Sequence, residues 1–360
     1  MNNRVDPKFI SKIEKFGKLP EWNECFHCGS CTAVCNLTEE KALFPRKEIR
    51  LMQMGLKNRL LACTEPWECY YCGDCTEKCP RDANPGELMM TLRRYFSSVY
   101  DWTGLAGLFN KSGISLAIAF IIIGLIPIIL LFSLFPSDVS GAIKFGHHFE
   151  QWAIIGVAGL LLIPAIFRMY WHTILKEKAK VPFSAYIIQL GNLIYTGLFQ
   201  PKFLSCDNNK LKWFTHLLIV YGYIILLVVV VIFGWLTENV HPVVYWAGYV
   251  ISAVVIIFTF DVVIGRLRKH KELNKFSKPG DWLFPIWLFM FALFGFAVRL
   301  LRDIIPVDEF DGNTFSLIIY VLYLVVMFQW ALIIVPFGKW THFLFRPFAL
   351  YFAKIKRSAG

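Results

Sequence analysis

Six long apolar runs limit the folds open to this chain of 360 residues. They cover about 114–135, 150–172, 213–236, 243–265, 282–302 and 315–338. An α-helix rises about 1.5 Å per residue, so a run of about 20 residues crosses the roughly 30 Å hydrocarbon layer of a membrane. The hydrophobic content of 56% exceeds that of ordinary soluble proteins. We therefore predict a mainly α-helical protein with a six-helix transmembrane bundle.

The charge of the segments between these runs predicts their side of the membrane. Lys and Arg gather in 173–212, in 266–281 and after residue 338, whereas the segment after the fifth run is acidic. Basic loops stay on the cytoplasmic side. The polar first 100 residues show no secretory signal. We expect a multi-pass protein of the cytoplasmic (inner) membrane with both termini inside. The net charge of +11 then reflects topology, not nucleic-acid binding.

Two groups of four cysteines stand in the polar N-terminal region. They are Cys25-x2-Cys28-x2-Cys31-x3-Cys35 and Cys69-x2-Cys72-x2-Cys75-x3-Cys79. This is the spacing of bacterial two-cluster ferredoxins, in which the fourth cysteine of each run ligates the other cluster. It predicts two 4Fe–4S clusters, with the ligand sets Cys25, Cys28, Cys31, Cys79 and Cys69, Cys72, Cys75, Cys35. A zinc-ribbon pair is the alternative, but zinc ligands usually come two and two. Cys63 fits neither group and is interpreted as a buried thiol.

Histidines at the ends of the apolar runs indicate haem. His216 opens the third run and His342 follows the sixth, so both lie at the cytoplasmic end. Haem b in helical bundles is held by imidazoles from facing helices. We predict one haem b on His216 and His342, with His172 at the same depth as a competing partner. A second haem on the far side could use His148 or His147 together with His241.

These assignments divide the chain into three predicted parts. Residues 1–110 form a cytoplasmic, α-helical ferredoxin-like domain with two 4Fe–4S clusters. Residues 111–345 form the transmembrane haem b domain, and 346–360 form a basic cytoplasmic tail. No G-x-G-x-x-G stands between a strand and a helix, so flavin and nicotinamide sites are expected on partner proteins.

Two known modules resemble the two halves of the chain. CFHCGSCTAVCNL, FPRKEIRLMQMG and WECYYCGDCTEKCPRDANPGELMMTLRRY resemble the iron–sulfur C subunit of heterodisulfide reductases across nearly all of 20–97. The apolar runs are similar to the haem b subunit of those enzymes and to the gamma subunit of nitrate reductase. GKWTHFLFRPF and KWFTHLLIVYGY resemble the haem-ligand motifs of that family, which implies His342 and His216. Its second histidine pair is not matched, because Leu226 and Leu324 stand near those positions.

Fusion of these modules in one chain resembles the C subunits of quinone-interacting membrane-bound oxidoreductase complexes (Qmo). This resemblance implies an electron-transfer subunit that is active within a complex, with menaquinone as substrate and membrane lipid around it. The implied partners are the A and B subunits, which are flavin and iron–sulfur proteins related to heterodisulfide reductase A, and indirectly adenylylsulfate (APS) reductase. The implied setting is dissimilatory sulfur metabolism.

Two other interpretations stay open at this point. One is the membrane subunit of a heterodisulfide reductase or of a sulfite-reductase-linked complex. The other, from a different class, is a membrane anchor or redox sensor whose clusters do not turn over with quinone. No residue of the chain is assigned as catalytic.

Overall fold

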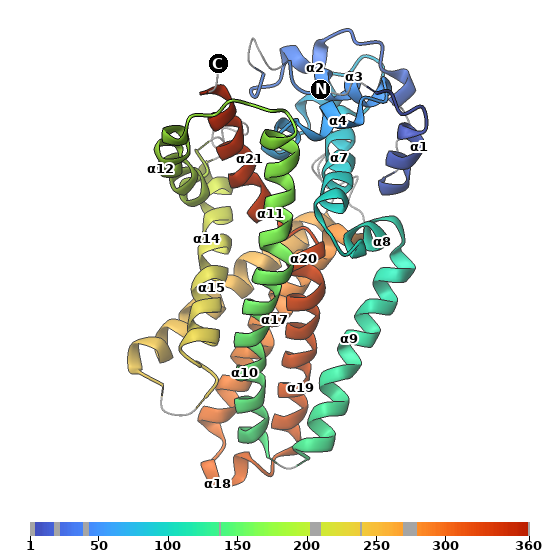
Figure 1. Cartoon of the computed structure of the whole chain (residues 1–360). Helices are drawn as coiled ribbons and strands as arrows, with labels where there is room; N and C mark the ends of the chain where they lie inside the picture. Colours follow the sequence, from blue (N-terminus) through green and yellow to red (C-terminus); the bar gives the residue numbers. More distant parts are fainter. Residues whose placement is uncertain are drawn as a thin grey trace.

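The computed structural model describes residues 4–17, 22–38, 43–136, 138–201, 210–237, 240–268 and 279–358. Every regular element within these ranges is helical. Figure 1 shows a long bundle with the N-terminal domain at one end and the short helix α18 (Val307–Phe310) at the other. The predicted mainly α-helical fold is confirmed.

Short helices separated by turns build the N-terminal domain. They are α1 Phe9–Ile13, η1 Glu14–Phe16, η2 Trp22–Glu24, α2 Ser30–Ala33, α3 Arg46–Gln53, α4 Lys57–Leu61, α5 Glu65–Glu68, α6 Asp74–Glu77, α7 Pro85–Tyr100 and α8 Leu105–Lys111. The longest is α7, which starts with Pro85 and is capped by the Asn84 side chain, an acceptor 3.3 Å from the Glu87 amide. Proline at the first helical position and asparagine at the cap both favour a helix start.

Six helices of the described part of the chain are long and apolar enough to cross a membrane, as the sequence predicts: Gly113–Leu134, Val139–Leu175, Trp213–Ile232, Pro242–Leu267, Trp282–Ile304 and Thr314–Arg357. This is the arrangement of a multi-pass membrane protein. Their elements are α9 Gly113–Leu134, α10 Val139–Val157, η3 Ala158–Leu162, α11 Ile163–Tyr170, η4 Trp171–Leu175, α14 Lys210–Leu227, η5 Val228–Ile232, α15 Pro242–Leu267, α17 Pro279–Ile304, α19 Thr314–Gln329, η6 Trp330–Ile334, α20 Val335–Phe337 and α21 Thr341–Arg357, with the shorter apolar α12 at Phe183–Phe199.

The second and sixth of these helices differ from the sequence expectation. The second begins at Val139, not near residue 150, because Asp138 caps it and accepts a hydrogen bond of 2.6 Å from the Gly141 amide. After the sixth apolar run, a new helix α21 covers most of the segment interpreted as a tail from residue 346. Its residues Phe345, Phe352 and their apolar neighbours recur every three or four positions and form a buried face.

The N-terminal domain and the adjoining ends of the membrane helices share one hydrophobic core. Phe96 and Tyr100 of α7 pack in the same buried cluster as Met169 of α11 and Phe345 and Phe352 of α21. The aromatic rings of Tyr100 and Phe345 lie 5.4 Å apart at 71°. Burial of these large side chains on both sides fixes the domain to the bundle.

Candidate cofactor sites

The two cysteine groups are built in the same way. The backbone angle φ is 58° at His27 and 93° at Gly29 in the first group, and 56° at Tyr71 and 98° at Gly73 in the second. The two glycines precede the one-turn helices α2 and α6. Such left-handed conformations suit glycine, which lacks a Cβ atom. Equivalent positions of the two repeats therefore bend the chain in the same way around their cysteines.

Four cysteines from both groups line one small cavity: Cys35, Cys69, Cys72 and Cys75. They are the set that the ferredoxin spacing assigns to the second cluster. Burial raises the pKa of Cys75. The nearby thiols of Cys69, Cys72 and Cys35 raise it further. Bound iron offsets this repulsion, since it stabilises thiolates that would otherwise remain protonated. The donors therefore fit an iron–sulfur cluster.

The remaining ligand set also gathers in space. Burial raises the pKa of Cys31. The nearby thiols of Cys25, Cys28 and Cys79 raise it further. Cys31 is also close enough for its charge to raise the pKa of Cys75, which belongs to the other set. The two sets are thus close neighbours, as exchange of electrons between two clusters requires.

A cavity of about 840 Å³ lies between the cluster domain and the membrane helices. This volume is within the range of ligand and cofactor pockets. His216 of α14 and His342 of α21 both line it. Cys69, Tyr70 and Tyr71 line this cavity as well as the small cavity of the second cysteine set, so the two cavities share a wall.

The two histidines of this cavity have different neighbours. The Nε2 atom of His216 lies 3.1 Å from Oε1 of Gln200. The Nδ1 atom of His342 is buried without a hydrogen-bond partner, and Trp67 stacks on its ring at a centroid distance of 6.2 Å. A buried ring nitrogen without a partner is unfavourable, and metal coordination uses an imidazole in its neutral form. Both imidazoles reach one cavity, as two residues that would hold a haem must, and haem there stays a prediction.

His172 lies outside the lining of the large cavity. Its ring packs against Tyr100 at 6.4 Å, and its Nδ1 atom is buried without a hydrogen-bond partner. The structure therefore brings His216 and His342 to one cavity and leaves the competing His172 beside α7.

Positive charge surrounds the large cavity. Its basic lining residues are Lys15, Arg93, Arg94, Lys111, Arg266, Lys339 and Arg346. Burial lowers the pKa of Arg93 to about 10, which leaves it charged at neutral pH, and its guanidinium donates to the Trp67 carbonyl at 3.2 Å. Arg346 lies over the Tyr70 ring, 3.4 Å from the centroid. Arginines so placed favour carboxylates such as haem propionates.

The histidines at the opposite end of the bundle have other contacts. The rings of His147 and His148 lie 6.3 Å apart, and Nε2 of His147 is 3.1 Å from Nε2 of Gln151. The Nδ1 atom of His241 accepts from the Val243 amide and so caps α15. A second haem on these residues stays a prediction.

Leucines fill the positions where the resemblance would put a second haem pair. Leu226 and Leu324 are 1% and 0% exposed, in one buried cluster with Tyr223, Tyr320 and Tyr323. These leucines are therefore part of the packed core of the bundle.

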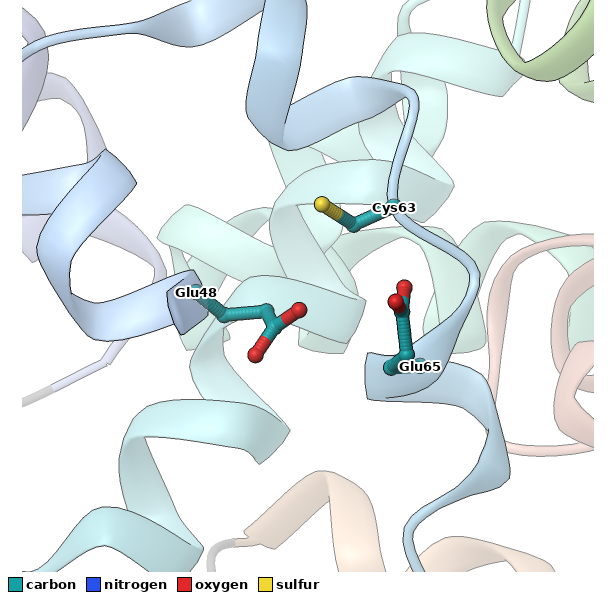
Figure 2. A group of neighbouring side chains, drawn as sticks. All are labelled: Glu48, Cys63 and Glu65. Carbon is teal, nitrogen blue, oxygen red and sulfur yellow. The ribbon is translucent and has the colours of Figure 1, made fainter. Parts of the chain in front are cut away.

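A buried group of acids and a thiol was not foreseen from the sequence. Figure 2 shows Glu48, Cys63 and Glu65, whose ligand-type atoms lie within 4.8 Å of one another. Nζ of Lys47 lies 2.5 Å from Glu65 and 3.4 Å from Glu48. Because this ammonium group already provides a cation, we interpret the cluster as a lysine-bridged carboxylate pair, not as a metal site.

The position of Lys47 gives the two carboxyl groups pKa values that are shifted in opposite directions. Burial, followed by the charge of Glu65, raises the pKa of Glu48 to about 7. Burial opposes ionisation of Glu65 too, but Lys47 outweighs it and lowers the pKa of Glu65. Burial raises the pKa of Cys63, whose Sγ lies 3.4 Å from the Arg59 carbonyl. Cys63 is thus a neutral buried thiol at pH 7.

Comparisons with known proteins identify the N-terminal region. Residues 21–83 match the 4Fe–4S dicluster domain family. A protein of Archaeoglobus profundus, named as similar to the C subunit of heterodisulfide reductase, is 36% identical over 83 residues, 23% of this chain and 44% of that protein. The second C-type iron–sulfur subunit of the CoB–CoM heterodisulfide reductase of Methanocaldococcus jannaschii is 32% identical over 98 residues, 25% of this chain and 52% of that protein. This region is a 4Fe–4S dicluster domain.

The resemblance of the cluster domain to the C subunit of heterodisulfide reductases is therefore confirmed, and so is the expectation of iron–sulfur clusters. The chain spans about half the length of the curated relatives that it matches, 44% and 52%. No solved structure matches the chain. The family match at 21–83 ends before the first membrane helix, which begins at Gly113.

Proposed function

We propose that this chain is the membrane subunit of a quinone-linked oxidoreductase complex of the cytoplasmic membrane. It relays electrons between menaquinone or menaquinol and its two 4Fe–4S clusters, and on to soluble flavin and iron–sulfur subunits of the Qmo A and B type. APS reductase is the indirect partner. The observation that carries this proposal is the wall of Cys69, Tyr70 and Tyr71 shared by the histidine-lined cavity and the second cysteine cage.

His216 and His342, which both line the cavity, would hold haem b through their imidazoles. Bound there, haem b would supply one-electron transfer between quinone and the clusters. Two imidazole ligands leave no open iron position for oxygen chemistry, so the site favours electron relay. Arg93 and Arg346 would orient and neutralise carboxylates at the wall of the cavity.

The membrane side of the same cavity has the character of a quinone site. Leu283, Phe284 and Leu288 of α17 and Ile333 of η6 line it. An apolar lining with few polar groups suits an isoprenoid quinone. Tyr223 also lines it, and its hydroxyl accepts from Nε1 of Trp330 at 3.2 Å, so its own proton can be donated to a carbonyl oxygen of a quinone ring.

The test is a haem, iron and sulfide count with reduced-minus-oxidised visible spectra on the purified full-length chain. The wild type should show a b-type spectrum, and His216→Ala or His342→Ala should remove it while iron and sulfide for two clusters remain. His172→Ala is the matched control, since this histidine lies at the same end of the bundle but outside the cavity lining. It should keep the spectrum.

Two outcomes contradict the haem assignment. One is a purified wild-type chain with iron and sulfide for the clusters and no haem. The other is loss of the b-type spectrum in His172→Ala together with its retention in His342→Ala. Reduction of the wild-type chain by a menaquinol analogue then tests the quinone, because a mere anchor or redox sensor would not turn over.

The relatives favour one further candidate, the membrane subunit of a heterodisulfide reductase, since both relatives are named for that enzyme. The purified complex separates the two candidates. Electron delivery from menaquinol to flavin partners, without reduction of a heterodisulfide, supports the quinone-linked sulfur pathway. Heterodisulfide-dependent oxidation of the clusters supports the alternative.

A further inference from the structure

The helix α12 (Phe183–Phe199) presents its apolar side chains outward and its polar side chains to the protein. Its large exposed side chains are aliphatic or aromatic, among them Phe183, Ile187, Ile188, Leu190, Ile194 and Leu198. Gln189, Asn192 and Thr196 recur every three or four positions and are half-buried on the opposite face. A helix on the surface of a water-soluble protein has the reverse arrangement. The material that covers the outer face of α12 must therefore be apolar.

Hydrogen bonds hold the polar face of α12 against the protein. Nζ of Lys354 on α21 donates to Oδ1 of Asn192 at 2.8 Å, and the Asn192 amide donates to Oε1 of Gln189 at 2.7 Å. Near the start of the helix, the Tyr351 hydroxyl donates to the Tyr186 carbonyl at 2.8 Å. Rotation of α12 to bury its apolar face would break these bonds, so the apolar face stays outside.

The last turn of α12 lies beside a membrane-spanning helix. The Tyr221 hydroxyl donates to the Leu198 carbonyl at 2.7 Å, and Nε1 of Trp213 donates to the Phe199 carbonyl at 3.0 Å. Trp213 is the first residue of the span Trp213–Ile232, and Tyr221 stands eight residues later, which corresponds to about 12 Å along that helix. The end of α12 is therefore level with the first turns of the span.

Positive charge at both ends of α12 argues against a further crossing of the membrane. Exposed Lys178 and Lys180 precede the helix, and exposed Lys210 follows it at the start of α14. Lysines on both flanks stay on one side of the membrane, where anionic headgroups attract them. The 17 residues of α12 are about 26 Å long, shorter than the roughly 30 Å hydrocarbon layer. Figure 1 shows α12 at the cluster end of the bundle.

We propose that α12 lies in the plane of the membrane, with its outer face among the acyl chains of the leaflet on the cluster side. The flanking lysines would contact anionic headgroups of that leaflet. A helix with one apolar face and basic flanks binds at this depth, between headgroups and acyl chains. Thr196 and Gly197 of α12 line the large cavity, so the helix would form part of the wall between that cavity and lipid. This placement does not depend on haem or quinone.

Photocrosslinking of the full chain in liposomes of phosphatidylglycerol and phosphatidylethanolamine tests the proposal. A benzophenone amino acid, p-benzoylphenylalanine, in place of Ile188, which is 68% exposed, should form lipid adducts that mass spectrometry detects on the α12 peptide. The same probe in place of Phe26, 70% exposed on the cluster domain, is the matched control and should form none. In place of Ile122 on the span α9 it should form lipid adducts in any case.

The same variants irradiated in native membranes distinguish lipid from a protein that covers α12. Lipid adducts at Ile188 in both settings support the proposal. A crosslink from Ile188 to another protein or to a second copy of the chain would overturn it, and so would absence of lipid adducts at Ile188 when Ile122 forms them. Ile194, on the same face, takes the probe if the Ile188 variant does not fold, which the visible absorbance of the iron–sulfur clusters reports.

Discussion

Glu48 has no hydrogen-bond partner for either carboxyl oxygen, although its side chain is fully buried. Its only close cation among the described residues is Lys47 at 3.4 Å, which lies nearer to Glu65 at 2.5 Å. The contrast between the two carboxyl groups follows from that asymmetry. Lys47 neutralises the carboxylate of Glu65 well. Burial of Glu48 then favours its protonated form.

This arrangement predicts a pH-dependent stability of the chain. The pKa of Glu48 rises from 4.5 to about 7 on folding, so the folded state prefers the protonated form and loses stability as pH rises from about 4.5 to 7. Glu48→Gln removes that loss. We expect the variant to be more stable than the wild type at pH 8, by about 1–3 kcal/mol, with a flatter melting-temperature profile between about pH 5 and 8.

Glu65→Gln is the control for this prediction, because the pKa of Glu65 is lowered by Lys47 and loss of its charge should destabilise the fold. Melting curves of the three proteins across that pH range give the answer. An unchanged pH profile in Glu48→Gln would show that another group sets it.

The crossed cluster ligation predicts which cluster depends on Cys79. If Cys79 completes the set of Cys25, then Cys79→Ala and Cys25→Ala should lose the same electron paramagnetic resonance signal of the reduced protein. Cys72→Ala should lose the other signal. Cys63→Ser should keep both, because this buried thiol belongs to neither set. A Cys79→Ala spectrum that matches Cys72→Ala would instead mean uncrossed ligation.

At the scale of the elements, the close approach of α10 and α19 depends on one glycine. A Cβ atom on Gly146 would lie 2.0 Å from the Tyr320 hydroxyl and 3.0 Å from Leu324, whereas none of the surrounding atoms lies within 4 Å at Gly156. Gly146→Ala should therefore destabilise the bundle by about 1–3 kcal/mol, as overpacking of a core does. Gly156→Ala on the same helix is the matched control.

Unfolding in detergent and denaturant measures both variants. Gly156→Ala should be neutral or slightly stabilising, since alanine favours a helix more than glycine by about 1 kcal/mol. Equal stability of the two variants would contradict the packing of α10 against α19.

Most of this helical architecture follows from the sequence, because apolar runs of membrane length have few alternatives to a helix. The first half of α10 was missed for a physical reason: Lys144, His147 and Glu150 break the apolar run, and only the bundle supplies the partners that the buried Glu150 needs. The helix α12 was missed because a run of 17 residues between basic segments has no unique placement from sequence.

The candidate sites divide in the same way. Spacing along the chain assigns the cysteine sets, since the ligands of each loop lie within a few residues of one another. The sequence and the resemblance already favour His342 over His172 as the partner of His216, and what the structure adds is that His216 and His342, but not His172, line one cavity. The contact of Glu48 with Cys63 and Glu65 joins three segments that no sequence pattern connects.

For the molecule as a whole, the topology predicts that the cluster domain and the end of α21 lie on the cytoplasmic side. Figure 1 places α1 to α7 and the end of α21 at one end of the bundle. A green fluorescent protein fused after residue 358 should fluoresce, and alkaline phosphatase there should be inactive. Phosphatase inserted at 311–313, near α18, should be active. The reverse pattern of activities would contradict this orientation.

The hydrophobic core shared by α7, α11 and α21 has a kinetic consequence. Because Phe96 and Tyr100 are buried together with Met169 and Phe345, the cluster domain cannot leave the bundle without exposing a large apolar surface. Some electron carriers deliver charge by swinging a tethered head between two docking positions. Here donor and acceptor would stay at one fixed separation, and the rate of internal transfer should not change with solvent viscosity.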